Sequence, residues 1–142
     1  MLTTIAYYVV LLATVVYLAV YGGRTGLWGG GLQISTSLLS LVAVLAFGGT
    51  PLVIPMLQIV DFLSLGWKSA LVLFSNRRWP VWVAAFQLNV VGAHLSIWLV
   101  PDWEGHLYYA MITVWGIPTL LVMILGTALD YRRRAKTGTI TV

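Results

Sequence analysis

Residues 52–74 read LVIPMLQIVDFLSLGWKSALVLF, a long apolar run that contains only two charged side chains, Asp61 and Lys68. A transmembrane helix needs about 20 consecutive, mostly apolar residues, because the hydrocarbon core of a bilayer is about 30 Å thick. Residues 79–100, WPVWVAAFQLNVVGAHLSIWLV, form a second run of this kind, and only the polar link 75–78 separates the two. Such a short link predicts two antiparallel membrane-spanning helices.

Three further apolar runs extend this pair toward both ends of the chain. Residues 2–21 and 107–129 are long enough to span, whereas 32–47 reaches that length only if its helix takes in the glycines 29–31. Residues 1–4 carry no positive charge, so we expect the first run to be a retained span rather than a signal peptide. The sequence predicts an all-α, polytopic transmembrane helix bundle in a single domain (1–142), with about five spans (2–21, 32–47, 52–74, 79–100, 107–129).

The composition supports a membrane protein and argues against an enzyme. The chain is 60% hydrophobic and 8% charged, whereas ordinary globular chains carry roughly a quarter charged residues. It has no cysteine, so it has no disulfide, thiolate metal site or catalytic thiol. No phosphate-binding loop, nucleophile elbow or zinc-protease motif is present, and we expect neither catalysis nor a bound metal. The net charge of +4 is explained by position, and nucleic acid is not an expected partner.

The charged residues orient the predicted bundle. With five spans, the connectors alternate between two sides, and basic residues collect on one of them: Arg24, Arg77, Arg78, Arg132, Arg133, Arg134 and Lys136. Asp102 and Glu104 fall on the other side. Because positive charge gathers on the cytoplasmic side of membranes, the N-terminus is predicted outside and the C-terminus in the cytoplasm. The basic residues of the 75–78 link and of the tail are expected to fix this topology and to contact lipid headgroups.

A buried polar constellation is predicted in the third and fourth spans: Asp61, Lys68, Gln87, Asn89 and His94. Asp61 and Lys68 are seven residues apart, and so are Gln87 and His94, which places each pair on one helix face. Residues equally distant from the centre of the 75–78 link meet at the same depth in an antiparallel pair. The spacing therefore matches Asp61 with His94 and Lys68 with Gln87 in depth. If the two faces point at each other, two polar rungs cross this helix pair.

Several roles fit this constellation. The simplest is a hydrogen bond between Asp61 and His94 that fixes the register of the two helices. A carboxylate near the middle of a bilayer needs a partner or a proton, so the pair is also a candidate for holding or passing a proton. His94, Trp115 and Pro118 are candidate contacts for a quinone, pigment or lipid. His106 lies in a predicted outer turn, which argues against a bis-histidine haem.

Two further features bear on packing. A polar stripe in the second run is expected to face protein rather than lipid, and it consists of Ser35, Thr36, Ser37 and Ser40. Pro55 and Pro118 lie inside predicted spans, where a proline removes a backbone hydrogen bond and predicts a kink.

The C-terminal half carries a resemblance. It rests on the segments Asn76-Arg77-Arg78-Trp79-Pro80-Val81-Trp82, Ala85-Phe86-Gln87-Leu88, Gly92-Ala93-His94-Leu95, Tyr109-Ala110 and Trp115-Gly116-Ile117-Pro118. This part of the chain, roughly residues 60–134, resembles uncharacterised small polytopic inner-membrane proteins of proteobacteria. The resemblance implies a multi-pass location in a bacterial inner membrane, and it implies no activity.

Three functional hypotheses follow. The leading one is a non-catalytic accessory or structural subunit that packs beside other integral membrane subunits and lipids, with respiratory or photosynthetic energy-converting complexes as candidate hosts. The second is a binder of a hydrophobic cofactor around His94. The third is a small oligomeric transporter or channel that uses Asp61.

Overall fold

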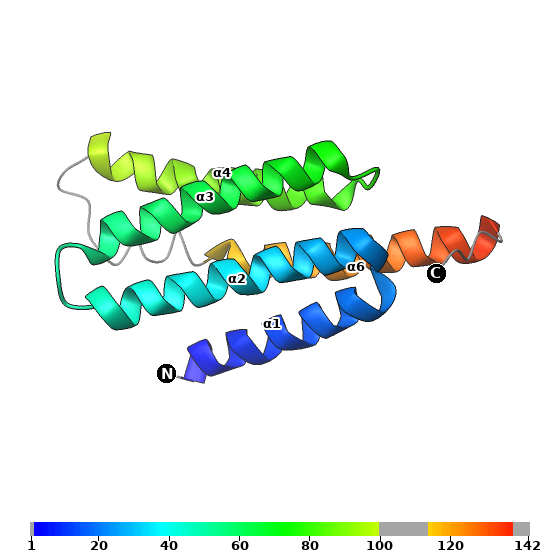
Figure 1. Cartoon of the computed structure of the whole chain (residues 1–142), viewed down its shortest axis with the longest axis horizontal. Coiled ribbons are helices and arrows are strands. Elements are labelled where there is room, and N and C mark those ends of the chain that lie inside the picture. Colours follow the sequence, from blue (N-terminus) through cyan, green and yellow to red (C-terminus); the bar gives the residue numbers. More distant parts are fainter. Residues whose placement is uncertain (1, 100–113, 138–142) are drawn as a thin grey trace.

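The computed structural model describes residues 2–99 and 114–137, and the regular structure within these ranges is α-helical. Figure 1 shows long helices lying side by side, and α2, α3 and α4 each run back along the helix before them. The predicted all-α bundle is therefore confirmed for the described residues. The helices are α1 (Leu2–Tyr21), α2 (Gly23–Phe47), α3 (Val53–Phe74), α4 (Trp79–Leu99) and α6 (Gly116–Thr137).

These helices close into a ring. Helix α1 contacts α2, α2 contacts α3, α3 contacts α4, α4 contacts α6, and α6 returns to α1. Helices α3 and α4 begin and end within one residue of the predicted spans 52–74 and 79–100. A ring of helices creates an interior whose walls come from every member, so side chains far apart in the sequence can meet there.

Helix α2 begins well before the short apolar run 32–47 and takes in the three glycines of the run 29–31. Only Gly22 separates it from α1, and the left-handed φ of +59° at Gly23 belongs to this tight link. A Cβ on Gly22 would lie 2.6 Å from Gly26 Cα, so the link has no room for a larger residue. Glycine is a poor helix former, but this intrinsic preference is weak and close packing overrides it.

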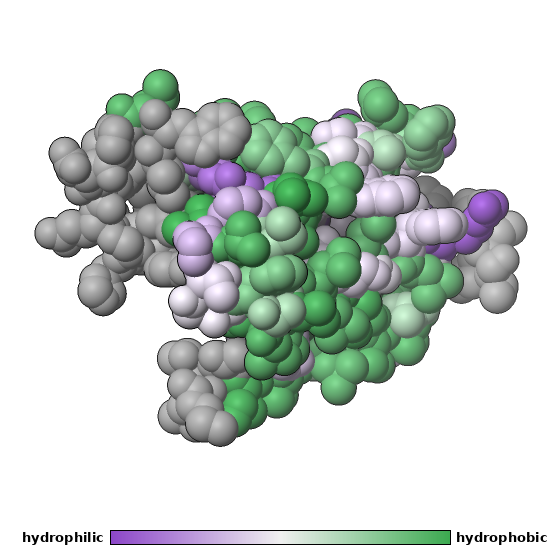
Figure 2. All heavy atoms as spheres, turned by 60° about the vertical axis from the view of Figure 1, so that its left-hand side comes forward, coloured by the Kyte–Doolittle hydropathy of each residue, from purple (hydrophilic) through white to green (hydrophobic). Residues whose placement is uncertain are grey.

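The distribution of side chains is inverted relative to that of a soluble protein. Large hydrophobic residues project outward from every described helix, and Figure 2 shows them covering much of one face. Among the described residues, ten polar or charged side chains are buried, nearly as many as the eleven buried hydrophobic ones. Soluble proteins rarely bury lysine, glutamine or histidine in such proportion.

Helices α2 and α3 are each long and apolar enough to cross a membrane. Only 22% of the most apolar window of each helix is buried inside the bundle, so neither is the hidden core helix of a soluble domain. The apolar part of α1, Ile5–Tyr21, is shorter. Length and composition therefore support two membrane-crossing helices among the described residues.

Helix α6 differs from the predicted fifth span. It begins at Gly116 and continues to Thr137, whereas the apolar run predicted a span over 107–129. Residues 107–113, and the acidic connector before them, lie outside the described residues. The helix extends through the basic tail because Arg, Lys and Ala favour helix and no Gly or Pro interrupts them before residue 138.

The kink predicted at Pro55 is wrong, whereas near Pro118 the described residues begin at Val114, and a turn at Trp115 separates this residue from α6. Pro55 is the third residue of α3, and Pro118 is the third residue of α6. The first-turn N–H groups of a helix have no intrahelical acceptor, so proline at these positions removes no hydrogen bond. Pro55 therefore belongs to a helix start rather than to a bend within a span.

Trp79 fills the ring near the link between α3 and α4. It is 5% exposed and packs with Leu18 and Met123, which come from α1 and α6. Two glycines make room for its ring, because a Cβ on Gly29 or on Gly126 would collide with the Trp79 side chain. The tryptophan thus joins α1, α2, α4 and α6 at this end of the bundle.

Candidate functional site

An imidazole–carboxylate pair joins α4 to α3 inside the ring. His94 Nε2 lies 2.8 Å from Asp61 Oδ2, and the His94 side chain is completely buried. The Asp61 side chain keeps 15% of its surface exposed. The two residues were matched in depth by their equal distance from the helix link, and the structure places them in direct contact. The contact holds the two helices in one register.

Lys68 and Gln87 form the second predicted rung. Lys68 Nζ donates to Gln87 Oε1 at 2.6 Å, and both side chains are 5% exposed. Gln87 Nε2 then donates to Asp61 Oδ1 at 2.9 Å and to the Asp61 carbonyl at 3.2 Å. The two rungs are therefore one continuous chain, from Lys68 through Gln87 and Asp61 to His94.

The net charge of these four hydrogen-bonded side chains depends on how many protons they hold. With Lys68 protonated, Asp61 ionised and His94 neutral, the four hydrogen-bonded side chains together have no net charge, which a low-dielectric interior favours. One more proton on His94 would give the four side chains together a single positive charge.

Gln58 extends the network, and the sequence analysis missed it. Its Nε2 lies 3.5 Å from the His94 carbonyl, at the limit of a hydrogen bond, and the side chain is 8% exposed. Gln58, Asp61 and Lys68 are spaced by three and seven residues, so all three share one face of α3. That spacing is the signal that could have identified Gln58.

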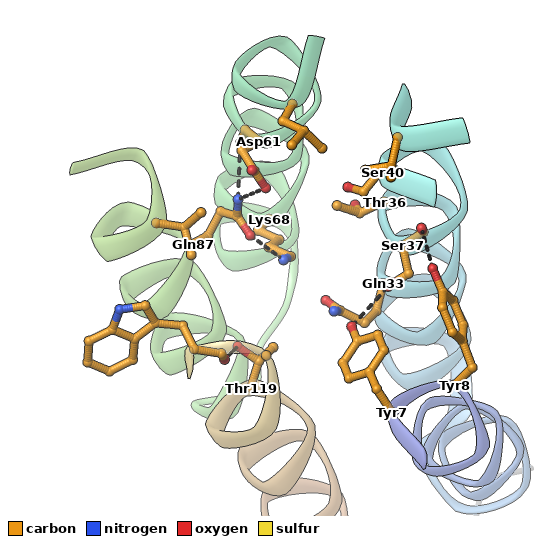
Figure 3. A pocket seen from close by; sticks show the side chains of 15 residues that line it. Tyr7, Tyr8, Gln33, Thr36, Ser37, Ser40, Asp61, Lys68, Gln87 and Thr119 are labelled. Atoms are coloured by element: carbon orange, nitrogen blue, oxygen red, sulfur yellow. Dashed lines mark hydrogen bonds between the residues drawn. The ribbon is translucent and has the colours of Figure 1, made fainter. Parts of the chain in front are cut away.

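A pocket of about 300 Å³ lies inside the ring, beside this chain. Figure 3 shows Asp61, Lys68 and Gln87 on one wall and polar side chains of α1 and α2 on the opposite wall. Every described helix contributes to the walls. The lining residues are Tyr7, Tyr8, Gln33, Thr36, Ser37, Ser40, Val44, Leu57, Asp61, Lys68, Gln87, Val90, Trp115, Gly116 and Thr119.

The α1–α2 wall is held by hydroxyl groups. The Tyr7 hydroxyl lies 3.0 Å from Ser37 Oγ, and the Tyr8 hydroxyl donates to the Ser37 carbonyl at 3.1 Å. Thr36 Oγ1 donates to Ser64 Oγ at 3.1 Å, which ties α2 to α3. The predicted polar stripe of α2 therefore faces protein at Thr36 and Ser37, although Ser35 is exposed. The two tyrosines were not predicted.

Two polar groups of the pocket have unused hydrogen-bonding capacity. Gln33 is 6% exposed, and its Oε1 has no hydrogen-bond partner among the described residues. The Lys68 ammonium carries three N–H donors, and Gln87 takes one of them. Figure 3 shows Gln33 and Lys68 extending from opposite walls into the space between α2 and α3. The pocket thus offers a donor and an acceptor to a small guest.

Asn89 does not belong to the buried constellation. It is exposed on α4, whereas Gln87 is buried. Two residues along an α-helix correspond to a rotation of about 200°, so a side chain two positions from an inward-facing residue points outward. The prediction of a buried Asn89 is wrong for this reason.

The three candidate ligand contacts do not line one cavity. Trp115 borders the central pocket and stacks on Phe86, with ring centroids 5.5 Å apart. His94 does not border that pocket, and its Nε2 is occupied by Asp61. Pro118 is half-buried in the first turn of α6 and does not line the pocket either. The structure therefore does not support a single ligand site around His94, Trp115 and Pro118.

The basic residues gather at one end of the bundle, where Figure 1 places the α1–α2 link, the α3–α4 link and the end of α6. Arg77 Nη1 lies 3.0 Å from Asp130 Oδ2, an ion pair by distance that lacks hydrogen-bond geometry. Arg78, Arg132, Arg133 and Lys136 are exposed, and Arg134 is half-buried.

Within the described ranges, no three His, Cys, Asp or Glu side chains come together as a potential metal site. No known protein family matches the sequence, and no curated protein or solved structure is significantly similar to it. The functional argument therefore rests on the geometry of the ring interior.

Proposed function

We propose that this chain is a multi-pass membrane protein that binds a small polar solute inside its helix ring, near the middle of the bilayer. The observation that carries the proposal is the central pocket, which all five described helices enclose. Ligand sites are typically concave and mostly apolar, with a few well-placed polar groups. Lys68, Gln33 and Asp61 are those groups here, and the site sits among outward-facing apolar residues.

The membrane placement is part of the proposal. We propose that α1, α2, α3, α4 and α6 all cross the bilayer of a bacterial inner membrane, with the N-terminus outside and the C-terminus in the cytoplasm. The clustering of basic residues at one end supports this orientation. A reporter enzyme that works only outside the cytoplasm should be active when inserted after Gly49. The same reporter should be silent after Asn76, and the opposite pattern would refute the orientation.

The pocket itself can be tested with single cysteines, because the chain has none of its own. Ser40 borders the pocket, whereas Leu38, in the same turn of α2, is 50% exposed on the outer surface. In lipid nanodiscs, a charged methanethiosulfonate reagent should label Ser40→Cys faster than Leu38→Cys. The reagent reaches a water-filled pocket but does not enter hydrocarbon.

The two ways in which this experiment can fail are distinct. If Leu38→Cys reacts faster, its face is in water, and the membrane placement is wrong. If neither cysteine reacts, while both react after unfolding in detergent, the pocket is closed to polar molecules. That second result would refute the solute site and leave the membrane placement intact.

A second candidate function is that of an accessory subunit, and Asn89 is the observation that favours it. Asn89 lies halfway along α4, exposed on the outer surface, between the small residues Ala85 and Gly92. An exposed amide at that depth is costly in lipid, and interhelical hydrogen bonds between polar side chains remove the cost. A helix of another membrane subunit would satisfy it.

Purification from native membranes in mild detergent, followed by mass spectrometry, tests this candidate. Other integral membrane subunits should accompany the wild-type chain in fixed stoichiometry, and Asn89→Leu should release them. Recovery of the chain without companion subunits would refute the accessory role.

A further inference from the structure

A second cavity of about 650 Å³ opens between the start of α2 and the end of α3, at the basic end of the bundle. It shares no lining residue with the central pocket. Its wall is divided into a polar part near the helix links and an apolar part farther along the two helices. The chain therefore presents an amphipathic groove that the proposed solute site does not use.

The polar part of the groove contains two guanidinium groups. Arg24 comes from the first turn of α2, and Arg77 from the α3–α4 link. Arg77 is also paired with Asp130, which limits the directions its guanidinium can take. Arg24 is exposed and forms no ion pair with any described residue. Guanidinium groups bind phosphate oxygens through charge-assisted hydrogen bonds, often two at a time.

The apolar part consists of large, outward-facing rings. Trp28 is 64% exposed, Trp67 is 59% exposed, and Phe74 is 90% exposed. Leu32 and Leu71, which are half-buried, also line the groove. Tryptophan side chains favour the boundary between headgroups and acyl chains, where one edge meets polar groups and the rest meets hydrocarbon. Along α2 the lining residues run from Arg24 through Trp28 to Leu32, which follows the order of groups in a phospholipid, and the lining residues of α3 beyond the link are apolar.

We propose that this groove binds one anionic phospholipid. The headgroup phosphate lies between Arg24 and Arg77, and an acyl chain lies along α2 and α3 between Trp28 and Trp67. The assignment rests on the membrane placement proposed above, because the basic end must lie at the headgroup level. A free phosphate ester would contact the two arginines alone and would leave the exposed aromatic rings of the groove uncovered.

The test uses the full chain, purified in mild detergent and titrated with phosphatidylglycerol. Native mass spectrometry counts the lipids that stay bound, and Arg24→Gln removes one charge from the groove. Arg132→Gln is the matched control, because it removes the same charge from an exposed position of α6 that does not line the groove. Arg24→Gln should weaken the tightest phosphatidylglycerol site by on the order of tenfold, as expected for a charge-assisted hydrogen bond. Arg132→Gln should leave it unchanged.

A second variant tests the apolar part without changing charge. Ala70 lines the groove and is half-buried, so Ala70→Phe should fill the acyl channel and also weaken phosphatidylglycerol binding. Equal losses in Arg24→Gln and Arg132→Gln would overturn the proposal, because they would show general attraction to the basic end. Equally tight binding of phosphatidylethanolamine, or displacement of the lipid by glycerol 3-phosphate, would overturn it as well. None of these results would alter the labelling of Ser40→Cys, so the two proposals fail separately.

Discussion

Gln87 places its amide between two charged side chains of α3, accepting from Lys68 at 2.6 Å and donating to Asp61 at 2.9 Å. Through this amide, the lysine is linked to the Asp61–His94 pair, and α4 is fastened to α3 by several contacts in succession. A neutral amide can serve both partners because it carries an acceptor and a donor on one rigid group. The four side chains are therefore expected to respond to substitution as a unit.

The first prediction concerns the energetic coupling of Asp61 and His94. Asp61→Ala and His94→Ala should each destabilise the bundle, and the double variant should lose less than the sum of the two. Each single variant leaves a buried polar partner behind, whereas the double variant removes both. We expect a coupling free energy of about 1–2 kcal/mol, near the upper end for hydrogen bonds between membrane helices. Equilibrium unfolding in mixed micelles measures it, and strict additivity would contradict direct pairing.

The second prediction concerns the packing of Trp79. Gly126→Ala should destabilise the bundle by about 1–3 kcal/mol, because overpacking forces neighbouring atoms apart. The added Cβ would collide with Trp79. Gly66→Ala is the control, since a Cβ on Gly66 meets nothing within 4 Å. If the collision is the cause, Gly126→Ala should cost less stability in a Trp79→Leu background than in the wild-type chain, because the shorter side chain leaves room for the added Cβ. Equal effects of the two alanine substitutions would rule out this cause.

The contacts just described differ in how far the sequence could predict them. The rungs between α3 and α4 followed from the short 75–78 link, because a tight antiparallel turn fixes the relative depth of all residues in the two helices. The spacing of seven residues also placed Asp61 and Lys68 on one face of α3, and Gln87 and His94 on one face of α4. It did not specify that the two faces point toward each other. Asn89 was assigned inward only because it is polar, and its rotation relative to Gln87 was overlooked.

The closure of the ring could not be predicted in the same way. Gln33 of α2, Lys68 of α3 and Thr119 of α6 all line the pocket. No single short link connects these three helices. Similarly, Gly29 and Gly126 accommodate the same Trp79 from different helices. Such contacts depend on how whole helices rotate and cross, and no periodicity in one segment specifies this. The sequence left open whether the helix over 32–47 takes in the glycines 29–31. It does so in α2, where Gly29 packs against Trp79.

The third prediction concerns the electric field inside the pocket. In a Ser40→Cys background, the rates at which an anionic and a cationic methanethiosulfonate reagent of similar size label the cysteine give a ratio that can be compared between variants. Lys68→Met should shift that ratio toward the cationic reagent, and Asp61→Asn should shift it toward the anionic one. A unit charge several ångströms away in a partly hydrated cavity changes the ratio by on the order of tenfold. If neither substitution changes the ratio of the two rates, neither charge acts on the pocket.

The fourth prediction asks whether the solute site supports movement of protons. Proteoliposomes that hold the wild-type chain and a pH-sensitive dye should dissipate an imposed pH gradient when a potassium ionophore compensates the charge. Asp61→Asn should abolish this flux, because the amide keeps the shape of the carboxylate but cannot take up a proton. Asp130→Asn makes the same chemical change next to Arg77, outside the pocket lining, and should leave the flux intact. If the wild-type chain carries no flux, or if both substitutions reduce it equally, the Asp61–His94 pair fixes helix register without relaying protons. In that case the pocket would be a binding site alone, and labelling at Ser40→Cys would persist while the gradient is maintained.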